Sequence, residues 1–188
     1  MGAKPPMRLE QRRSEGAFEL HSRSSSQPAS GKPPAPLLVS LSFRPIYAYI
    51  DGVREFGRFF CEKTFERPEL AERAQVVLQE TLENAIKYSS LDKDTELALE
   101  IASDGAELQI STLSHPDPAH LASLREEIEM LRLFDPEAAF IAAFARAARE
   151  PGTPAKLGLA RMRYESQFEL RVNEEPGGAV RVTAVGKL

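Results

Sequence analysis

The sequence predicts an α+β domain built as a two-layer α/β sandwich, in which a mixed, mostly antiparallel sheet of about five strands carries helices on one face. Two observations lead to this fold class. Short segments with alternating apolar residues occur as adjacent pairs joined by turn residues, and longer segments with helical apolar spacing lie between them. The 188 residues are enough for one domain of ordinary size that carries a flexible tail.

The predicted tail covers residues 1–36 and the predicted domain covers residues 37–188. Six prolines and six serines stand in the first 36 residues, with few large apolar side chains, so this part buries too little surface to offset the entropy of ordering. The tail has six Lys or Arg against three Glu. Its charge of +3 leaves −7 on the domain, since the whole chain carries −4, and opposite charges favour weak attraction between the two parts.

The domain begins with a strand and two helices. Residues 37–43 are apolar enough for a strand, and from Ile46 to Phe60 apolar residues recur at helical spacing. Residues 68–89 form the most regular predicted helix, because Pro68 suits a first helical turn and one apolar stripe runs along it. The stripe consists of Leu70, Ala74, Leu78, Leu82 and Ala85.

Two hairpins supply the remaining strands. Residues 96–102 and 107–113 alternate in polarity and are joined at Asp104-Gly105, a dipeptide that provides the positive φ angles of a tight turn. Residues 168–172 and 179–185 form the second pair, connected through a segment that contains Pro176-Gly177-Gly178. Both pairs are therefore expected to be antiparallel.

Three helices are expected between the hairpins. Asp117-Pro118 and Asp135-Pro136 each place a capping carboxylate before a proline suited to the first turn, so each marks the start of a helix. A loop over residues 153–157 then leads to a shorter helix over residues 159–166.

Composition excludes several functional classes. No apolar run approaches the length of a membrane span, and the N-terminal residues lack the apolar stretch of a secretory signal, so we expect a cytoplasmic protein without membrane contact. The net charge of −4 argues against nucleic acid as a partner. Cys61 is the single cysteine, which excludes an internal disulfide and a cysteine-based metal cluster.

The candidate site lies on the helix over residues 68–89. At 100° per residue, Glu80, Asn84 and Lys87 point within about 60° of one another, opposite the apolar stripe. An amide oxygen is a ligand that Mg²⁺ accepts, an ammonium compensates phosphate charge, and a carboxylate can act as a base. The alternative is a solvated helix face, in which Glu and Lys four residues apart, such as Glu83 and Lys87, are ordinary.

The string from Glu80 to Ser89 resembles the N-box of the histidine kinase-like ATPases, the GHKL or Bergerat-fold superfamily. The matching residues are Glu80, Asn84, Ala85, Lys87 and Tyr88. In the anti-sigma factor serine kinase branch, this resemblance implies that Glu80 is the catalytic base and that Asn84 binds Mg²⁺. It also implies that Lys87 faces phosphate and that Tyr88 lies on the adenine side of the nucleotide. The order of the predicted elements agrees with that fold over about 150 residues.

The sequence departs from the family at both glycine boxes. Where the family has Asp-x-Gly-x-Gly, this chain has residues 112–116, without aspartate or glycine and with the stiff Pro116. The second box is reduced to residues 155–159, where Gly158 remains and Lys156 is placed to compensate phosphate charge. This combination resembles the SiaB-type branch of bacterial serine kinases.

Three functions are consistent with these residues. The first is a degenerate histidine kinase-like domain, a pseudokinase that acts in bacterial signal transduction by partner switching, with ATP binding weak or lost. Its partner would be a STAS-type antagonist, a sigma factor or another signalling protein, and a homodimer is compatible with it. The second is an active protein serine kinase that uses ATP and Mg²⁺, with Glu80 as base, Asn84 on the metal, and Lys87, Tyr88, Lys156 and Gly158 around the nucleotide. The third is a purely structural domain.

Overall fold

The computed structural model describes residues 35–89, 96–149 and 157–188, and residues 35–188 form one compact unit. The predicted tail, except for its last two residues, lies outside the described residues, as does most of the predicted loop over residues 153–157. Within the described ranges, no helix is both long and apolar enough to cross a membrane.

In the part of the chain that the structure describes, five strands form one open sheet. Its order is β1-β2-β3-β5-β4, and each of the four neighbouring pairs is antiparallel. The strands are β1 (Leu37–Phe43), β2 (Leu97–Ser103), β3 (Glu107–Ser114), β4 (Glu169–Glu174) and β5 (Val180–Lys187). Both predicted hairpins are present, and the first strand starts at the predicted residue.

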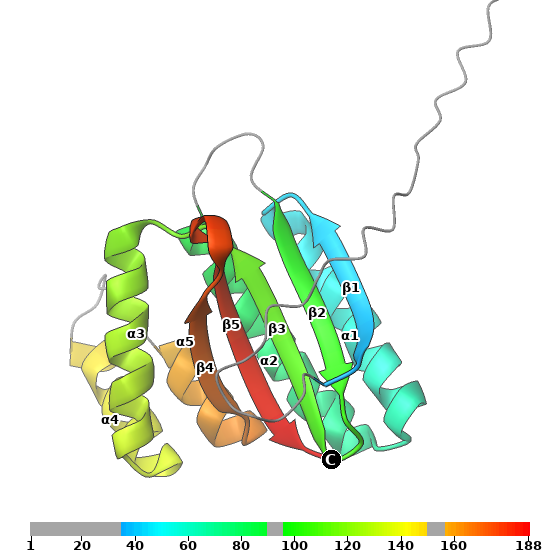
Figure 1. Cartoon of the computed structure of the whole chain (residues 1–188). Helices are drawn as coiled ribbons and strands as arrows, with labels where there is room; N and C mark the ends of the chain where they lie inside the picture. The colour runs from blue at the N-terminus through cyan, green and yellow to red at the C-terminus, as the bar shows by residue number, and fades with distance from the viewer. Residues whose placement is uncertain (1–34, 90–95, 150–156) are drawn as a thin grey trace, which may run out of the picture. The chain divides into compact units, whose positions relative to one another are not determined.

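Within the described residues, five helices accompany the sheet. They are α1 (Ile50–Phe65), α2 (Pro68–Tyr88), α3 (Pro118–Leu133), α4 (Pro136–Arg149) and α5 (Leu157–Arg161). Short helical turns are η1 (Tyr47–Tyr49), η2 (Met162–Ser166) and η3 (Pro176–Gly178). Helices α1, α2 and α5 cover one face of the sheet, and α3 and α4 lie beyond β4 (Figure 1). The predicted fold class, a two-layer sandwich of antiparallel strands and helices, is confirmed.

The core lies between the sheet and α2. Alternate residues of β2, namely Leu97, Leu99 and Ile101, are fully buried, as the alternation in the sequence predicts. They face the apolar stripe of α2, all of whose predicted members are buried: Leu70, Ala74, Leu78, Leu82 and Ala85. The opposite side of α2 is consequently left for polar residues.

Local signals fix the ends of several elements. The side chain of Asp117 accepts a hydrogen bond from the Ala119 amide at 2.8 Å, and Asp135 caps α4 in the same way. In the first hairpin only Gly105 has a positive φ, of 84°, whereas Asp104 instead accepts hydrogen bonds from two following amides. The expectation that both residues of the dipeptide supply positive φ angles is therefore wrong, because the loop contains three residues rather than two.

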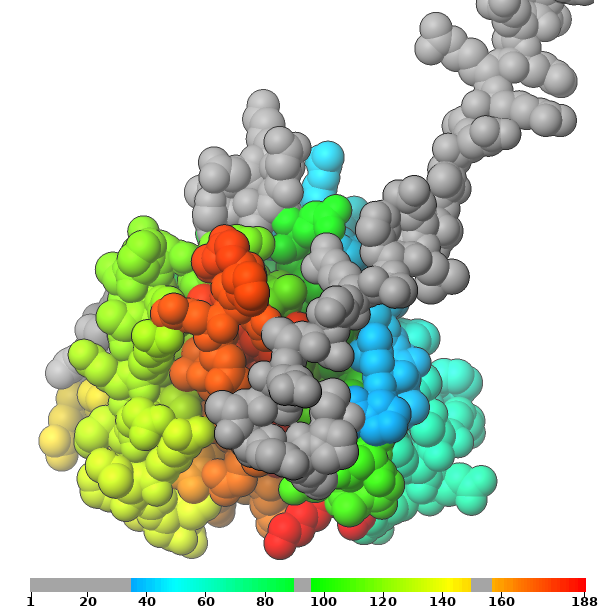
Figure 2. Space-filling view, viewed as in Figure 1, coloured from blue at the N-terminus to red at the C-terminus, as the bar shows by residue number. Residues whose placement is uncertain are grey.

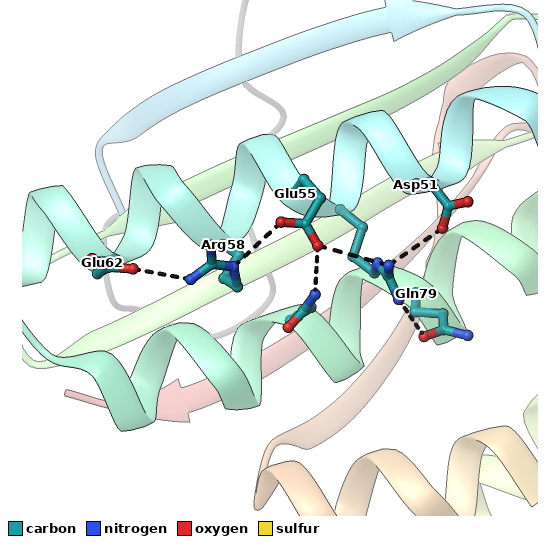
Figure 3. Close-up of polar contacts among 7 residues, drawn as sticks. Asp51, Glu55, Arg58, Glu62 and Gln79 are labelled. Carbon is teal, nitrogen blue, oxygen red and sulfur yellow. Dashed lines mark hydrogen bonds and ion pairs between the residues drawn. The ribbon is translucent and has the colours of Figure 1, made fainter.

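A polar network joins α1 to α2 (Figure 3). Arg54 on α1 donates to Gln79 at 3.3 Å and lies 3.4 Å from the Asp51 carboxylate, while Glu55 accepts from Gln75 at 3.0 Å. Gln79 in turn donates to Glu83 at 3.0 Å. These contacts hold the polar side of α1 against α2 and orient the turn of α2 that carries Glu80.

Candidate functional site

The candidate site is formed where the C-terminal half of α2 meets α5. Helix α2 presents its apolar stripe to the sheet, so Glu80 and Asn84, which lie one turn apart, face sideways toward the start of α5. Both side chains are partly buried. Gly158 lies in the first turn of α5, and its backbone approaches both of them.

Gly158 is required here by close packing. A Cβ atom added at this position would lie 2.2 Å from Oε2 of Glu80 and 3.9 Å from Nδ2 of Asn84. Any side chain larger than hydrogen would therefore displace the Glu80 carboxylate. Gly158, which the resemblance assigns to a second glycine box, thus has a structural reason to be present, whether or not a nucleotide binds.

The Glu80 carboxylate is paired with a residue that the sequence analysis did not identify. Nη1 of Arg161 lies 3.1 Å from Oε1 of Glu80, and Nε of Arg161 lies 2.8 Å from Oε2 of Glu165. The side chain of Glu80 is only 12 % exposed. Arg161 follows Gly158 by one helical turn, and that spacing is the signal that could have pointed to it.

Burial dominates the protonation of this carboxyl group. Removal from water raises the pKa of Glu80, the positive charge of Arg161 opposes that rise, and the nearby Glu83 carboxylate adds to it. A raised pKa is a common property of catalytic acids and bases, but buried structural ion pairs produce it as well. The pKa shift is therefore compatible with either role.

A small cavity lies beside Asn84. Its volume is about 30 Å³, whereas cavities for drug-sized ligands measure about 300–1,000 Å³. The walls are mostly apolar, with Pro116 after β3, Leu124 on α3, and Leu159 and Met162 after Gly158. As it stands, this space holds about one water molecule and does not fit an adenine nucleotide.

Tyr88 lies in the wall of the cavity, and Lys87 lies next to the Tyr88 ring. Tyr88 lines it together with Asn84, and the Tyr88 ring lies 4.7 Å from the ring of His120 on α3. Lys87 is exposed, and its Nζ lies 5.1 Å from the centre of the Tyr88 ring. The contact between Tyr88 and His120 places α3 over the side of the cavity where the family resemblance puts adenine.

The structure brings together part of the predicted site. Glu80, Asn84 and Gly158 meet, and Asn84 and Tyr88 share the cavity wall. Lys87, which helical geometry groups with Glu80 and Asn84, has its Nζ over the Tyr88 ring and is not part of the cavity wall that Asn84 lines. Lys156 lies outside the described residues. Among the described residues, no group of three His, Cys, Asp or Glu side chains is arranged for a metal ion.

The end of α3 is anchored to the turn that follows α5. Arg163, which is 8 % exposed, donates through Nη1 to the backbone carbonyl groups of Leu131 and Phe134. Arg132 of α3 donates to the carbonyl of Leu170 at 3.0 Å, and Arg125 lies 2.6 Å from Glu174. These contacts fasten α3 to β4 and to η2.

Comparison with known proteins shows that the fold of this chain is similar to that of solved structures. No protein-family model matches the chain, and a search of curated proteins finds no match in sequence. Fourteen chains of solved structures match it. One is a chain of the crystal structure of the SiaB–SiaC complex from Pseudomonas aeruginosa, with a TM-score of 0.60 and 18% sequence identity. The match covers 82% of this chain and 92% of that chain, so the two share the fold over nearly the whole described domain.

Proposed function

We propose that this chain is a bacterial regulatory protein of the partner-switching kind, which acts by binding another signalling protein and in which ATP binding is weak or lost. The observation that carries the proposal is the cavity beside Asn84, which has a volume of about 30 Å³ and mostly apolar walls. The likeness to a chain that was crystallised in a protein–protein complex supports a binding role, since that complex joins SiaB to SiaC.

The residues that replace the first glycine box explain why the cavity is small. Pro116 fixes the chain after β3, and its segment pairs with Ser89 at the end of α2. Leu124 from α3 then fills the space in front of Asn84. A nucleotide would need both segments to move, and the Tyr88–His120 contact together with the anchors of Arg163 opposes that movement.

The helices α3 and α4 offer a surface for a protein partner. Five large apolar side chains are exposed there, a group that we call the helical patch: Met130, Leu133, Phe134, Ile141 and Phe144. Leu133 and Phe144 are 76 % and 60 % exposed. Large apolar side chains that are exposed on a protein surface are frequent in protein-binding sites. A small STAS-type protein is the partner that the proposed function favours.

The alternative is an active serine kinase, which is favoured by the meeting of Glu80, Asn84 and Gly158. Bound ATP and Mg²⁺ would supply the phosphoryl group and the charge that stabilises its transfer, with Asn84 as the residue suited to hold the metal. Glu80 would be the base, and it would have to separate from Arg161 to accept a proton from a serine hydroxyl.

Titration calorimetry of the full chain with ATP and Mg²⁺, beside an Asn84→Ala variant, tests the proposal. We expect no measurable ATP binding by either protein. The same wild-type sample should bind a STAS-type protein from the same organism, and Phe144→Glu in the helical patch should weaken that binding. Micromolar ATP binding that Asn84→Ala abolishes would overturn the proposed loss of ATP binding and favour the kinase.

A further inference from the structure

A second pocket lies between the start of α4, the turn η2 and the start of β4. Its volume is about 380 Å³, which is within the range of about 300–1,000 Å³ for pockets that hold small ligands. It shares no residue with the cavity beside Asn84, so it is a separate site. We call it the acidic pocket, and its walls consist of Asp135, Pro136, Glu137, Arg163, Tyr164, Gln167 and Glu169.

Negative charge dominates the acidic pocket. Its three carboxylates contribute −3 and the guanidinium of Arg163 contributes +1, so the side chains of the walls carry −2. The start of a helix adds about half of a positive charge, which is too little to reverse this sign. The side chain of Glu137 is exposed, and among the described residues it has no hydrogen-bond or ion-pair partner. A positively charged group is therefore the ligand whose charge complements this pocket.

Arg163 is the one basic side chain of the walls, and the protein already holds most of it. Its Nη1 donates to the carbonyl groups of Leu131 and Phe134, and its Nη2 lies 3.7 Å from Oε1 of Glu169. Arg163 is only 8 % exposed, and its Nε has no hydrogen-bond acceptor among the described residues. A buried donor without an acceptor is costly. An occupant that brings an oxygen acceptor together with a positive charge therefore suits the whole pocket.

Metal ions and anions fit these walls less well. Three carboxylates line the pocket, yet within the described part of the chain no three acidic side chains are arranged around one point for a metal ion. An anion would meet net negative charge, and the first amides of α4 are not free for it, because Asp135 accepts hydrogen bonds from the amides of Glu137 and Ala138. An organic cation is the class of ligand that remains.

Tyr164 gives the pocket an aromatic wall. Its ring is stacked on Phe140 with 5.0 Å between the ring centres, which holds it in place, and Tyr164 is 40 % exposed. A guanidinium or ammonium group is attracted to an aromatic ring within about 6 Å of the ring centre. A guanidinium is planar, stacks on rings and pairs with carboxylates through two parallel hydrogen bonds, so these walls favour arginine over lysine.

The acidic pocket borders the helical patch. Leu133 and Phe134 of the patch directly precede Asp135 in the chain, and the Phe134 carbonyl accepts a hydrogen bond from Arg163 in the pocket wall. Figure 2 shows α3, whose last turn carries part of the patch, on the side of the domain away from β1 and α1. A protein bound on the helical patch therefore lies next to the pocket.

We propose that the acidic pocket binds an arginine side chain of the protein partner whose apolar surface covers the helical patch. This inference rests on the proposed function, because it names a chemical feature of the partner that binds there. The guanidinium pairs with the carboxylates at the start of α4 and lies against the Tyr164 ring. A carbonyl oxygen of the partner's backbone is the acceptor for Nε of Arg163. The helical patch supplies apolar contact, and the pocket selects partners that carry the arginine.

Titration of the full chain with Nα-acetyl-L-arginine amide, followed by NMR, tests the pocket without any partner. The amide signals of Glu137, Tyr164 and Gln167 should shift at millimolar concentrations. They should not shift with Nα-acetyl-L-citrulline amide, which has nearly the same shape and no charge. Glu137→Gln should raise the dissociation constant about two- to fivefold, which is the effect of one exposed charge pair. Glu66→Gln, an exposed residue after α1, is the matched control and should leave the constant unchanged.

The same variants of the chain, titrated by calorimetry with the STAS-type protein, test the source of the arginine. Glu137→Gln should raise the dissociation constant of that complex about two- to fivefold, and Glu66→Gln should not change it. A lack of binding by the arginine amide, or equal binding by the citrulline amide, would overturn the proposal and leave the proposed function standing. Binding of the arginine amide with no effect of Glu137→Gln on the complex would show that the arginine is not the partner's. A wild-type chain that binds no STAS-type protein would overturn the proposed function, and the arginine amide then decides separately whether the pocket binds this cation.

Discussion

The close contact between Gly158 and Glu80 predicts that Gly158→Ala destabilises the wild-type protein but stabilises a variant that lacks the Glu80 carboxylate. In Gly158→Ala, the added methyl group would lie 2.2 Å from Oε2 and 3.1 Å from Cδ of Glu80. The carboxylate has to move, and it cannot do so without disturbing its 3.1 Å contact with Arg161. Overpacking of this kind costs about 1–3 kcal/mol, and replacing a helical glycine by alanine returns about 0.5–1 kcal/mol. We therefore expect a net loss of about 0.5–2 kcal/mol in the free energy of unfolding.

Removing the carboxylate should reverse the effect. In a Glu80→Ala background no carboxylate opposes the added methyl group, so Gly158→Ala should stabilise the protein by about 0.5–1 kcal/mol. The coupling energy between the two positions should thus be about 1–3 kcal/mol, within the range for residues in direct contact. Urea denaturation of the four proteins of this cycle measures it, provided that the m-values agree.

Glu83→Ala is the matched control background, because Glu83 lies on the same helix, contacts Gln79 and makes no contact with Gly158. In that background Gly158→Ala should remain destabilising. If Gly158→Ala has the same effect with and without the Glu80 carboxylate, Gly158 is not present to accommodate Glu80, and a role in ligand binding becomes the better explanation for this glycine.

Two further predictions concern Glu80 and Arg163. Because burial raises the pKa of Glu80, the folded state holds the proton more tightly than the unfolded chain, so this group's contribution to stability is full below its ordinary pKa of 4.5 and is lost as pH rises through the folded value. The stability of the wild type relative to Glu80→Gln, measured by urea denaturation, should therefore fall as pH rises above 4.5, and a constant or rising difference would show that Arg161 outweighs burial. Arg163→Met should lower the free energy of unfolding by about 1.5–3 kcal/mol and speed amide exchange at the end of α3, because it leaves the carbonyl groups of Leu131 and Phe134 without their charged donor. Arg171→Met on β4 is the control, since Arg171 is exposed, and equal losses in the two variants would contradict the anchoring role of Arg163.

The sequence predicted the fold well because its local signals agree with one another. The alternation over β2 and the stripe along α2 independently place the same residues in the core, and Asp117 and Asp135 mark helix starts through a hydrogen bond within their own turns. Such signals act over a few residues and can therefore be recognised in the sequence. The Asp104 turn was misjudged in detail, because the loop length that sets its geometry depends on the register of the paired strands.

The candidate site was only partly predictable. Helical geometry put Glu80 and Asn84 on one side of α2, and the structure agrees. It also suggested that Lys87 would join them, but the side chain has enough freedom to lie over Tyr88 instead. Arg161 was missed because it is separated from Glu80 by 81 positions in the sequence, and only its spacing of one helical turn from Gly158 pointed toward the site. The roles in binding ATP and Mg²⁺ that the resemblance implies stay predictions.

By itself the sequence determined about where most strands and helices begin, which of their faces are apolar, and which residues share the polar side of α2. These properties follow from spacing and from capping chemistry, which act within one turn or one hairpin. The tertiary structure alone decided that Arg161 pairs with Glu80, that Gly158 packs against that carboxylate, and that Pro116 and Leu124 close the space beside Asn84. It also decided which apolar side chains stay exposed at the β1 edge, because exposure depends on neighbours that only the folded chain brings together.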